Sequence, residues 1–215
     1  MQRAKSEQLD NNHGPSSTTL NLILLSALEC FSKRGYTGAS VREITQAAKV
    51  TKPTLYYYFS NKEELYKVLA KTCFEEILTS LNLVSDKGET TFERVMSYFC
   101  EYTRLCRERI AVVRFVHLMA MAPELTAPDV GTLEFSRKAA APLYEIMRIG
   151  IVNGEIKKDS ETDLFYTLMG IIQLRVTSLL IGASTTTDTS VIERAIQKAI
   201  SHSSVPDCHR LGTSK

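Results

Sequence analysis

Tryptophan is absent from this 215-residue chain, and glycine and proline are scarce, with ten and six residues. So few Gly and Pro exclude collagen-like and low-complexity chains, and a hydrophobic content of 44% excludes a fully disordered one. No stretch alternates apolar and polar residues cleanly, which argues against a protein built of strands. A chain of this length can bury a hydrophobic core without help from disulfides or metal.

The number and spacing of the cysteines do not indicate a set of disulfides or a zinc site. There are five of them, an odd number, and no two are spaced C-x-x-C. Most of them fall within helical patterns, so we expect neither a disulfide scaffold nor a zinc module, and no cofactor is indicated. The first seventeen residues are polar and lack the apolar core of a secretory signal. These features predict a cytoplasmic protein.

One apolar segment, 164–183, is long enough to raise the question of a membrane span. It carries Gln173 and Arg175 together with Ser and Thr residues, which hydrocarbon tolerates poorly. A helix buried within protein fits these residues better, so we expect no membrane partner.

Apolar residues recur at helical spacing throughout the N-terminal part of the chain. The first helix is expected to start at 17–19 and to stop at Gly35. A short second helix should follow Ser40, whose spacing to Glu43 is that of a capping box. The third and fourth helices have N-caps of their own in Thr51 and Asn61, and Pro53 fits the first turn of the third.

These patterns predict an all-α protein with two domains. A domain of three short helices is expected at 17–64, with a connecting helix that runs to about 81, and a second helical domain at 65–202. Within the second domain, a long helix should span about 130–153 with a kink or interruption at Pro142. Both termini, 1–16 and 203–215, are expected to be disordered.

Positive charge is concentrated between residues 33 and 62, where six Lys and Arg face a single acid, Glu43. Charge alone favours a solvated basic face over a DNA-binding surface, so the DNA-binding interpretation depends on the scaffold that carries the charge. Two short helices joined by a tight turn form a helix-turn-helix, whose second helix presents polar side chains to DNA bases. The polar residues left pointing outward on this scaffold are Arg42, Lys52, Thr54, Tyr56 and Tyr58.

Residues 23–69 read ILLSALECFSKRGYTGASVREITQAAKVTKPTLYYYFSNKEELYKVL. This segment resembles the DNA-binding domain of the TetR family of bacterial transcriptional regulators. The chain departs from the family pattern at Thr45 and Lys49, where Ala and Gly are usual, and at Tyr58, where His is common. The resemblance implies an N-terminal helix-turn-helix domain followed by a C-terminal ligand-binding and dimerisation domain.

The resemblance also implies roles for individual residues. Lys52, Pro53 and Thr54 would form the base-reading turn of the recognition helix, and Arg42 would reach bases or phosphate. For Tyr57 we expect packing in the core. The remaining DNA contacts implied by the resemblance, all to phosphate, are Tyr56, Tyr58 and Lys62.

The second domain should hold a dimer face and an effector pocket. Helices at 162–183 and 189–201 would form the homodimer contact, unless the first of them is simply central in the monomer. A redox role for Cys100 and Cys106 is a further reading, although buried Cys commonly acts as a small hydrophobe. The candidate effector contacts, of which His117 could equally be structural, are Tyr98, Tyr102, Arg114, His117, Met121, Tyr144 and Gln173.

Three classes of function follow from these residues. The first is a ligand-responsive regulator, in this family most often a repressor, which binds a palindromic double-stranded DNA operator as a dimer and is released by a small-molecule effector. The second is a helical enzyme or carrier, although the chain has no Gly-rich phosphate loop, no H-E-x-x-H and no Ser/His/Asp signature, and hence no candidate catalytic or metal residue. The third is a nonspecific architectural DNA binder.

Overall fold

The computed structural model describes residues 17–121, 124, 127–182 and 189–203. All regular structure in these residues is helical, including a short 3-10 turn at Lys158–Ser160. The expected N-terminal arm and nearly all of the expected C-terminal tail lie outside the described residues. The helices are α1 (Ser17–Gly38), α2 (Val41–Ala48), α3 (Lys52–Tyr58), α4 (Lys62–Asn82), α5 (Thr91–Glu108), α6 (Ile110–Met121), α7 (Thr132–Val152), α8 (Glu161–Leu180) and α9 (Thr189–Ser203).

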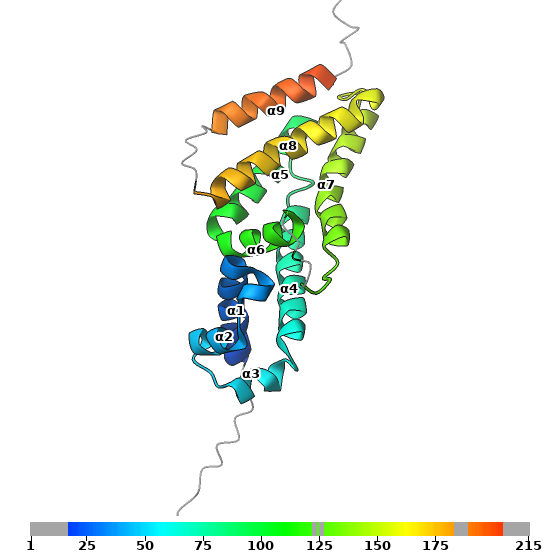
Figure 1. Ribbon diagram of the computed structural model, residues 1–215. Coiled ribbons are helices and arrows are strands. Elements are labelled where there is room, and N and C mark those ends of the chain that lie inside the picture. Colours follow the sequence, from blue (N-terminus) through cyan, green and yellow to red (C-terminus); the bar gives the residue numbers. More distant parts are fainter. Residues whose placement is uncertain (1–16, 122–123, 125–126, 183–188, 204–215) are drawn as a thin grey trace, which may run out of the picture.

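The helices are arranged along an elongated molecule (Figure 1). Helices α1 to α3 form one end, and α8 and α9 lie side by side at the other. Helix α4 leaves the α1–α3 end and packs against α1, α5, α6 and α7. Helix α6 lies against α1, so the N-terminal helices are held from two directions by the rest of the chain.

The starts of the second, third and fourth helices follow from caps that the sequence predicts. Ser40, Thr51 and Asn61 each accept a hydrogen bond from the backbone N–H three residues later, at the starts of α2, α3 and α4. Gly35 interrupts α1 with a φ of 69°, a left-handed value that glycine adopts without strain. The caps at Ser40, Thr51 and Asn61 are therefore confirmed, whereas Gly35 kinks the first helix and helical residues continue to Gly38.

Two boundaries in the C-terminal half differ from the sequence prediction. Helix α7 continues through Pro142, so no interruption occurs there, and the helix starts at Thr132. Proline is tolerated inside a helix when the structure around it accommodates the lost hydrogen bond, and here the Pro142 ring is buried. Helix α8 ends at Leu180, shortly before Gly182, whose φ is 66°.

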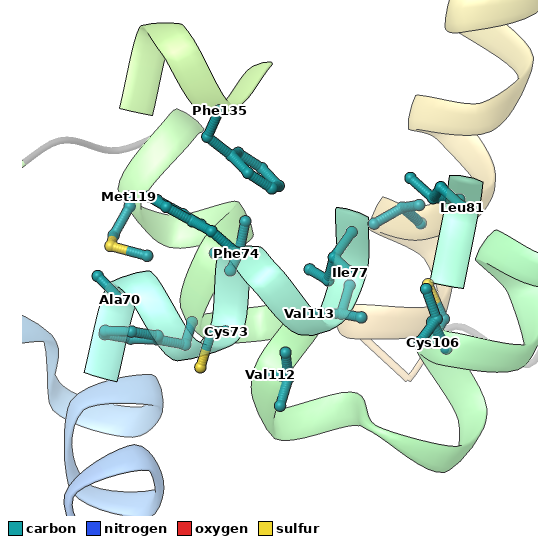
Figure 2. Packing of buried hydrophobic residues seen from close by; sticks show 14 of the residues in the cluster. Ala70, Cys73, Phe74, Ile77, Leu81, Cys106, Val112, Val113, Met119 and Phe135 are labelled. Carbon is teal, nitrogen blue, oxygen red and sulfur yellow. The ribbon is translucent and has the colours of Figure 1, made fainter. Parts of the chain in front are cut away.

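The buried side chains form one hydrophobic cluster that extends from α1 to α9. Figure 2 shows the part around α4, where the ring of Phe74 lies against that of Phe135 from α7, with ring centroids 4.2 Å apart. A second aromatic group joins the N-terminal helices to the rest of the chain, because Phe31 of α1 contacts Tyr66 of α4 and Phe115 of α6. The two predicted domains thus share a core.

Candidate DNA-binding surface

The second helix of the molecule is fixed at both ends by local interactions. The Ser40 hydroxyl accepts a hydrogen bond from the Glu43 N–H at 3.2 Å, and the Glu43 carboxylate accepts one from the Ser40 N–H at 3.1 Å. This reciprocal pair is the predicted capping box. At the other end Lys49 adopts a left-handed conformation, with φ 55° and ψ 38°, and turns the chain toward α3.

Because Lys49 occupies a backbone region that glycine tolerates better, Lys49→Gly should stabilise the protein. We expect the free energy of unfolding to rise by about 1 kcal/mol. Ala47→Gly, an exposed change inside α2, should instead lower it by about 1 kcal/mol. Urea unfolding followed by circular dichroism measures both variants, and a loss of stability in Lys49→Gly would contradict the strain at this turn.

Helix α3 is short and is positioned by its cap and by one apolar face. The Thr51 hydroxyl accepts from the Thr54 N–H at 3.2 Å and shares a 2.8 Å hydrogen bond with the Thr54 hydroxyl. Leu55 is fully buried and Phe59 nearly so, and their spacing of four residues places both on one side of the helix. The opposite side of α3 is therefore left to face solvent.

The structure brings the seven predicted DNA contacts onto one continuous stretch, from α2 to the first residue of α4. Arg42, Lys52, Pro53 and Tyr56 are exposed, whereas the other three are half-buried. None of the seven belongs to the buried core. Sequence reasoning thus located side chains that are available to a partner at this surface. The half-buried three are Thr54, Tyr58 and Lys62.

Lys62 has interactions within the protein as well. Its Nζ lies 4.3 Å from the centroid of the Tyr36 ring, a cation–π distance. Burial lowers the pKa of Lys62, and the nearby Glu124 carboxylate offsets part of that effect. The charge of Lys62 is therefore held near the junction between α1 and α4.

Tyr57 contradicts the expectation that it packs in the core, because its side chain is 70% exposed. Its ring meets that of Tyr58 edge-on, with centroids 5.4 Å apart. The spacing of Leu55 and Phe59 could have indicated that Tyr57 is exposed, because the residue midway between two buried positions lies on the far side of a helix. Tyr57 therefore belongs to the exposed side chains of α3, which sequence reasoning missed.

The positive charge of this region is only partly neutralised inside the chain. Arg34 forms an ion pair with Glu43, and Lys33 forms one with Glu29. Arg42, Lys49 and Lys52 form no ion pair in the part of the chain that the structure describes. Lys49 and Lys52 flank the turn between α2 and α3, and Arg42 lies in the first turn of α2. The phosphate backbone of a duplex would supply the missing negative charge.

The predicted effector contacts differ in burial and in the partners that they contact. Tyr98 is buried, and its hydroxyl donates a 2.8 Å hydrogen bond to the carbonyl of Ala139. Tyr144 is exposed and its ring stacks on Phe165. Met121 is 59% exposed at the end of α6. The other four predicted contacts, all half-buried, are Tyr102, Arg114, His117 and Gln173.

Two hollows in the described residues offer space for a ligand, and neither is lined by any of the seven predicted contacts. The larger, of about 710 Å³, lies between α1, α4, α6 and the start of α7. The smaller, of about 250 Å³, lies between α5, α8 and α9. No pattern in the sequence pointed to either, because each joins residues far apart in the chain. The volume of the larger hollow lies within the range of about 300 to 1,000 Å³ that small-molecule sites occupy, and that of the smaller lies just below this range.

The cysteines give no support to a redox role. Burial raises the pKa of Cys106 to about 11 and also raises that of Cys100. Reactive cysteines show the opposite shift, because only the thiolate is nucleophilic.

Among the residues that the structure describes, no group of three or more His, Cys, Asp or Glu is placed to hold a metal ion, and no helix is long and apolar enough to cross a membrane.

One face of α8 remains open. Tyr166, Leu174 and the C-cap residue Ile181 are each more than 70% exposed, and nothing would contact a side chain at Gly170 between them. We call these four residues the α8 face. The apolar residues Ile192 and Ile196 of α9 are buried within the chain. Of the two helices predicted to form the dimer contact, α8 thus presents exposed apolar side chains among the described residues.

Comparison with known proteins agrees with this geometry. Residues 23–69 match the model of a family described as bacterial regulatory proteins, tetR family. A protein of Staphylococcus aureus, the negative transcriptional regulator IcaR of the biofilm operon icaADBC, is 24% identical over 102 residues. That match covers 47% of this chain and 54% of IcaR, so the chain spans about half the length of this relative.

Solved structures share the fold over most of the chain. A TetR family transcription regulator from Marinobacter aquaeolei VT8 superposes with a TM-score of 0.67 at 21% identity, covering 87% of this chain and 96% of that one. FadR from Bacillus subtilis, in complex with stearoyl-CoA, gives a TM-score of 0.66 at 19% identity, covering 85% and 98%. At these identities the likeness concerns the fold.

Proposed function

Because the chain belongs to the TetR family of bacterial transcriptional regulators, we propose that it is a repressor that binds a palindromic operator as a homodimer and leaves it when a small-molecule effector binds the C-terminal half. The observation that carries the proposal is the surface around α3. There α3 is capped by Thr51, and its first residue Lys52, like Lys49 of the preceding turn and Arg42 of α2, forms no ion pair within the described residues.

Helix α3 would lie in the major groove of the duplex. Lys52, Pro53 and Thr54 form its first turn, which in a helix-turn-helix is the part that reaches base edges. The Pro53 ring can contact a thymine methyl group, and Lys52 can donate to guanine. The remaining side chains at this surface would contact phosphates and fix the orientation of α3, namely Arg42, Tyr56, Tyr58 and Lys62.

A second copy would place a second α3 on the next turn of the duplex. Helix-turn-helix dimers read half-sites about 34–36 Å apart. The α8 face lies at the end of the molecule opposite α3 and supplies apolar surface for the two-fold contact. A dimer formed there would leave both recognition helices free to reach DNA.

Release by an effector would follow from differential binding. A ligand that prefers a state with wrongly spaced recognition helices lowers operator affinity by the ratio of its affinities for the two states. Two relatives support this part of the proposal. IcaR is by name a negative regulator, and FadR, which shares the fold, is described in complex with stearoyl-CoA.

Binding of the full chain to fluorescent duplexes tests the proposal. Duplexes from the region upstream of its own gene should bind at nanomolar to sub-micromolar concentration, and random duplexes of equal length about a thousandfold more weakly. Equal affinity for both would favour the architectural DNA binder. No binding to either would favour a helical small-molecule-binding protein without operator function.

Arg42→Ala should weaken binding to every duplex by about the same factor and reduce the slope of log affinity against log salt concentration by about one, because one cation fewer displaces a phosphate counterion. Lys71→Ala is the control, since Lys71 is an exposed cation on α4 outside the proposed DNA surface. Fluorescence anisotropy across a series of salt concentrations measures both variants. An unchanged slope in Arg42→Ala would remove Arg42 from the interface.

A further inference from the structure

A carboxylate from the C-terminal half binds the end of α1. Glu124 lies between α6 and α7, and its Oε1 accepts a hydrogen bond from the Tyr36 N–H at 2.7 Å. Its Oε2 accepts from the Thr37 N–H at 2.9 Å and also from the Thr37 hydroxyl. Because α2 packs against α1, this carboxylate connects the C-terminal half to the helix-turn-helix.

The approach of Glu124 requires the glycine at position 35. With φ at 69°, a Cβ on Gly35 would lie 1.8 Å from Glu124 Oε1. An alanine there would therefore displace the carboxylate from the two N–H groups that it accepts from. Glu124 can therefore make its three hydrogen bonds only because residue 35 has no side chain.

The Glu124 carboxylate is ionised and can only accept hydrogen bonds. Burial raises its pKa, but the hydrogen bonds from Thr37 and Tyr36 and the charge of Lys62 outweigh burial, so the pKa lies below its usual value. An ionised carboxylate has no proton to donate. Any ligand group that competes with the α1 turn for Glu124 must therefore be a donor, and a cationic donor competes best.

The larger hollow opens directly against this contact. Gly35 and Glu124 both line it, so the carboxylate is accessible from the hollow, which we call the junction groove. Aromatic and apolar side chains make up most of its wall. Its volume of about 710 Å³ is that of a site for a drug-sized molecule. The rings that line it are Phe31, Tyr66 and Phe115.

The junction groove is lined by two acids and two cations, and both of the cations are paired with acids outside it. Of its two cations, Lys33 is paired with Glu29 and Arg34 with Glu43, and neither acid lines the groove. The groove's acids are Glu124 and Asp129. Lys62, the cation behind Glu124, is held over the Tyr36 ring and does not line the groove.

We propose that the junction groove binds an amphipathic organic cation, with its apolar body against the aromatic wall and its ammonium group on Glu124. Such a ligand would take the carboxylate from the Tyr36 and Thr37 N–H groups. The end of α1 would then lose its connection to the C-terminal half, and the operator-binding arrangement of α2 and α3 would be less favoured. This last consequence rests on the function proposed above, whereas the binding site does not.

Matched probes test the site on the full-length protein without a mutation. Titration calorimetry compares 4-phenylbutylammonium with 4-phenylbutanol and 5-phenylpentanoate, which share a phenyl ring and four methylenes and differ in the head group. The ammonium should bind about tenfold more tightly than the alcohol, and the carboxylate more weakly than either. In NMR spectra the Tyr36 and Thr37 amides should exchange faster with solvent when the ammonium is bound. Equal binding of all three probes, no binding of any, or unchanged amides would overturn the proposal.

Glu124→Gln removes the charge that selects the cation. This variant should bind the ammonium only as tightly as the alcohol, with its alcohol affinity unchanged. The control is Glu134→Gln, an exposed glutamate of α7 that does not line the groove, which should keep the full preference. Preference retained in Glu124→Gln would assign the cation to another site and refute the proposal.

Measurements of operator binding distinguish the proposed ligand site from its proposed effect on DNA binding. The ammonium should weaken operator binding of the wild type several-fold and leave that of Glu124→Gln unchanged. If the wild-type protein binds no operator at all, the proposed function fails while the calorimetry still decides the site. If the ammonium binds and frees both amides yet leaves operator affinity unchanged, the coupling through Glu124 is wrong.

Discussion

Leu174→Glu is expected to convert the dimer into a monomer and to lower operator affinity by about a hundredfold or more. Leu174 is 71% exposed in the middle of the α8 face. In a two-fold contact this face meets its own copy, so the substitution would bury two carboxylates without partners. A monomer engages only one half-site and loses the gain, on the order of a hundredfold or more, that comes from linking two.

Size-exclusion chromatography with light scattering measures the first effect, and fluorescence anisotropy on the operator measures the second. Val152→Glu is the matched control, because Val152 is 73% exposed at the end of α7 and lies outside the α8 face. It should remain dimeric with wild-type affinity. A Leu174→Glu protein that stays dimeric would place the two-fold contact elsewhere on the molecule.

Phe31→Ala should cost about 3 to 5 kcal/mol of folding free energy. Phe31 is 1% exposed, and its ring centroid lies 5.0 Å from that of Tyr66 and 6.2 Å from that of Phe115. The variant leaves a cavity at the point where α1, α4 and α6 meet. For a chain of this size the melting temperature should fall by roughly 6 to 20 °C.

Thermal unfolding followed by circular dichroism measures this loss. Leu22→Ala provides the comparison on the same helix, because Leu22 is 46% exposed and should cost less than about 1 kcal/mol. Similar melting temperatures for the two variants would contradict a core shared between the helix-turn-helix and the rest of the chain. Separate unfolding transitions in the wild type would contradict it as well.

The N-terminal helices could be predicted well because their signals are local. Ser40, Thr51 and Asn61 cap helices through hydrogen bonds that span three residues, so the side chain and its partner appear together in the sequence. Gly35 likewise marks a kink that depends on its own backbone. The exposure of Lys52 and Tyr56 followed from the spacing of the buried residues in α3.

The junction could not be predicted, because its contacts join distant parts of the chain. Glu124 and Tyr36 are 88 positions apart, and no periodicity relates them. The effector contacts were chosen as polar side chains on amphipathic helices, and that pattern does not separate a ligand contact from a structural bond. Tyr98 illustrates this, since its hydroxyl is engaged with the Ala139 carbonyl.

Selection from a pool of random-sequence duplexes measures most directly whether this protein reads DNA as a symmetric pair of recognition helices. The account predicts that the bound duplexes share two inverted copies of one short sequence, with centres about 34–36 Å apart or a multiple of that distance. Their affinity should fall steeply as salt concentration rises. A selected pool without an inverted repeat, or without any gain in affinity over the starting pool, would contradict the account.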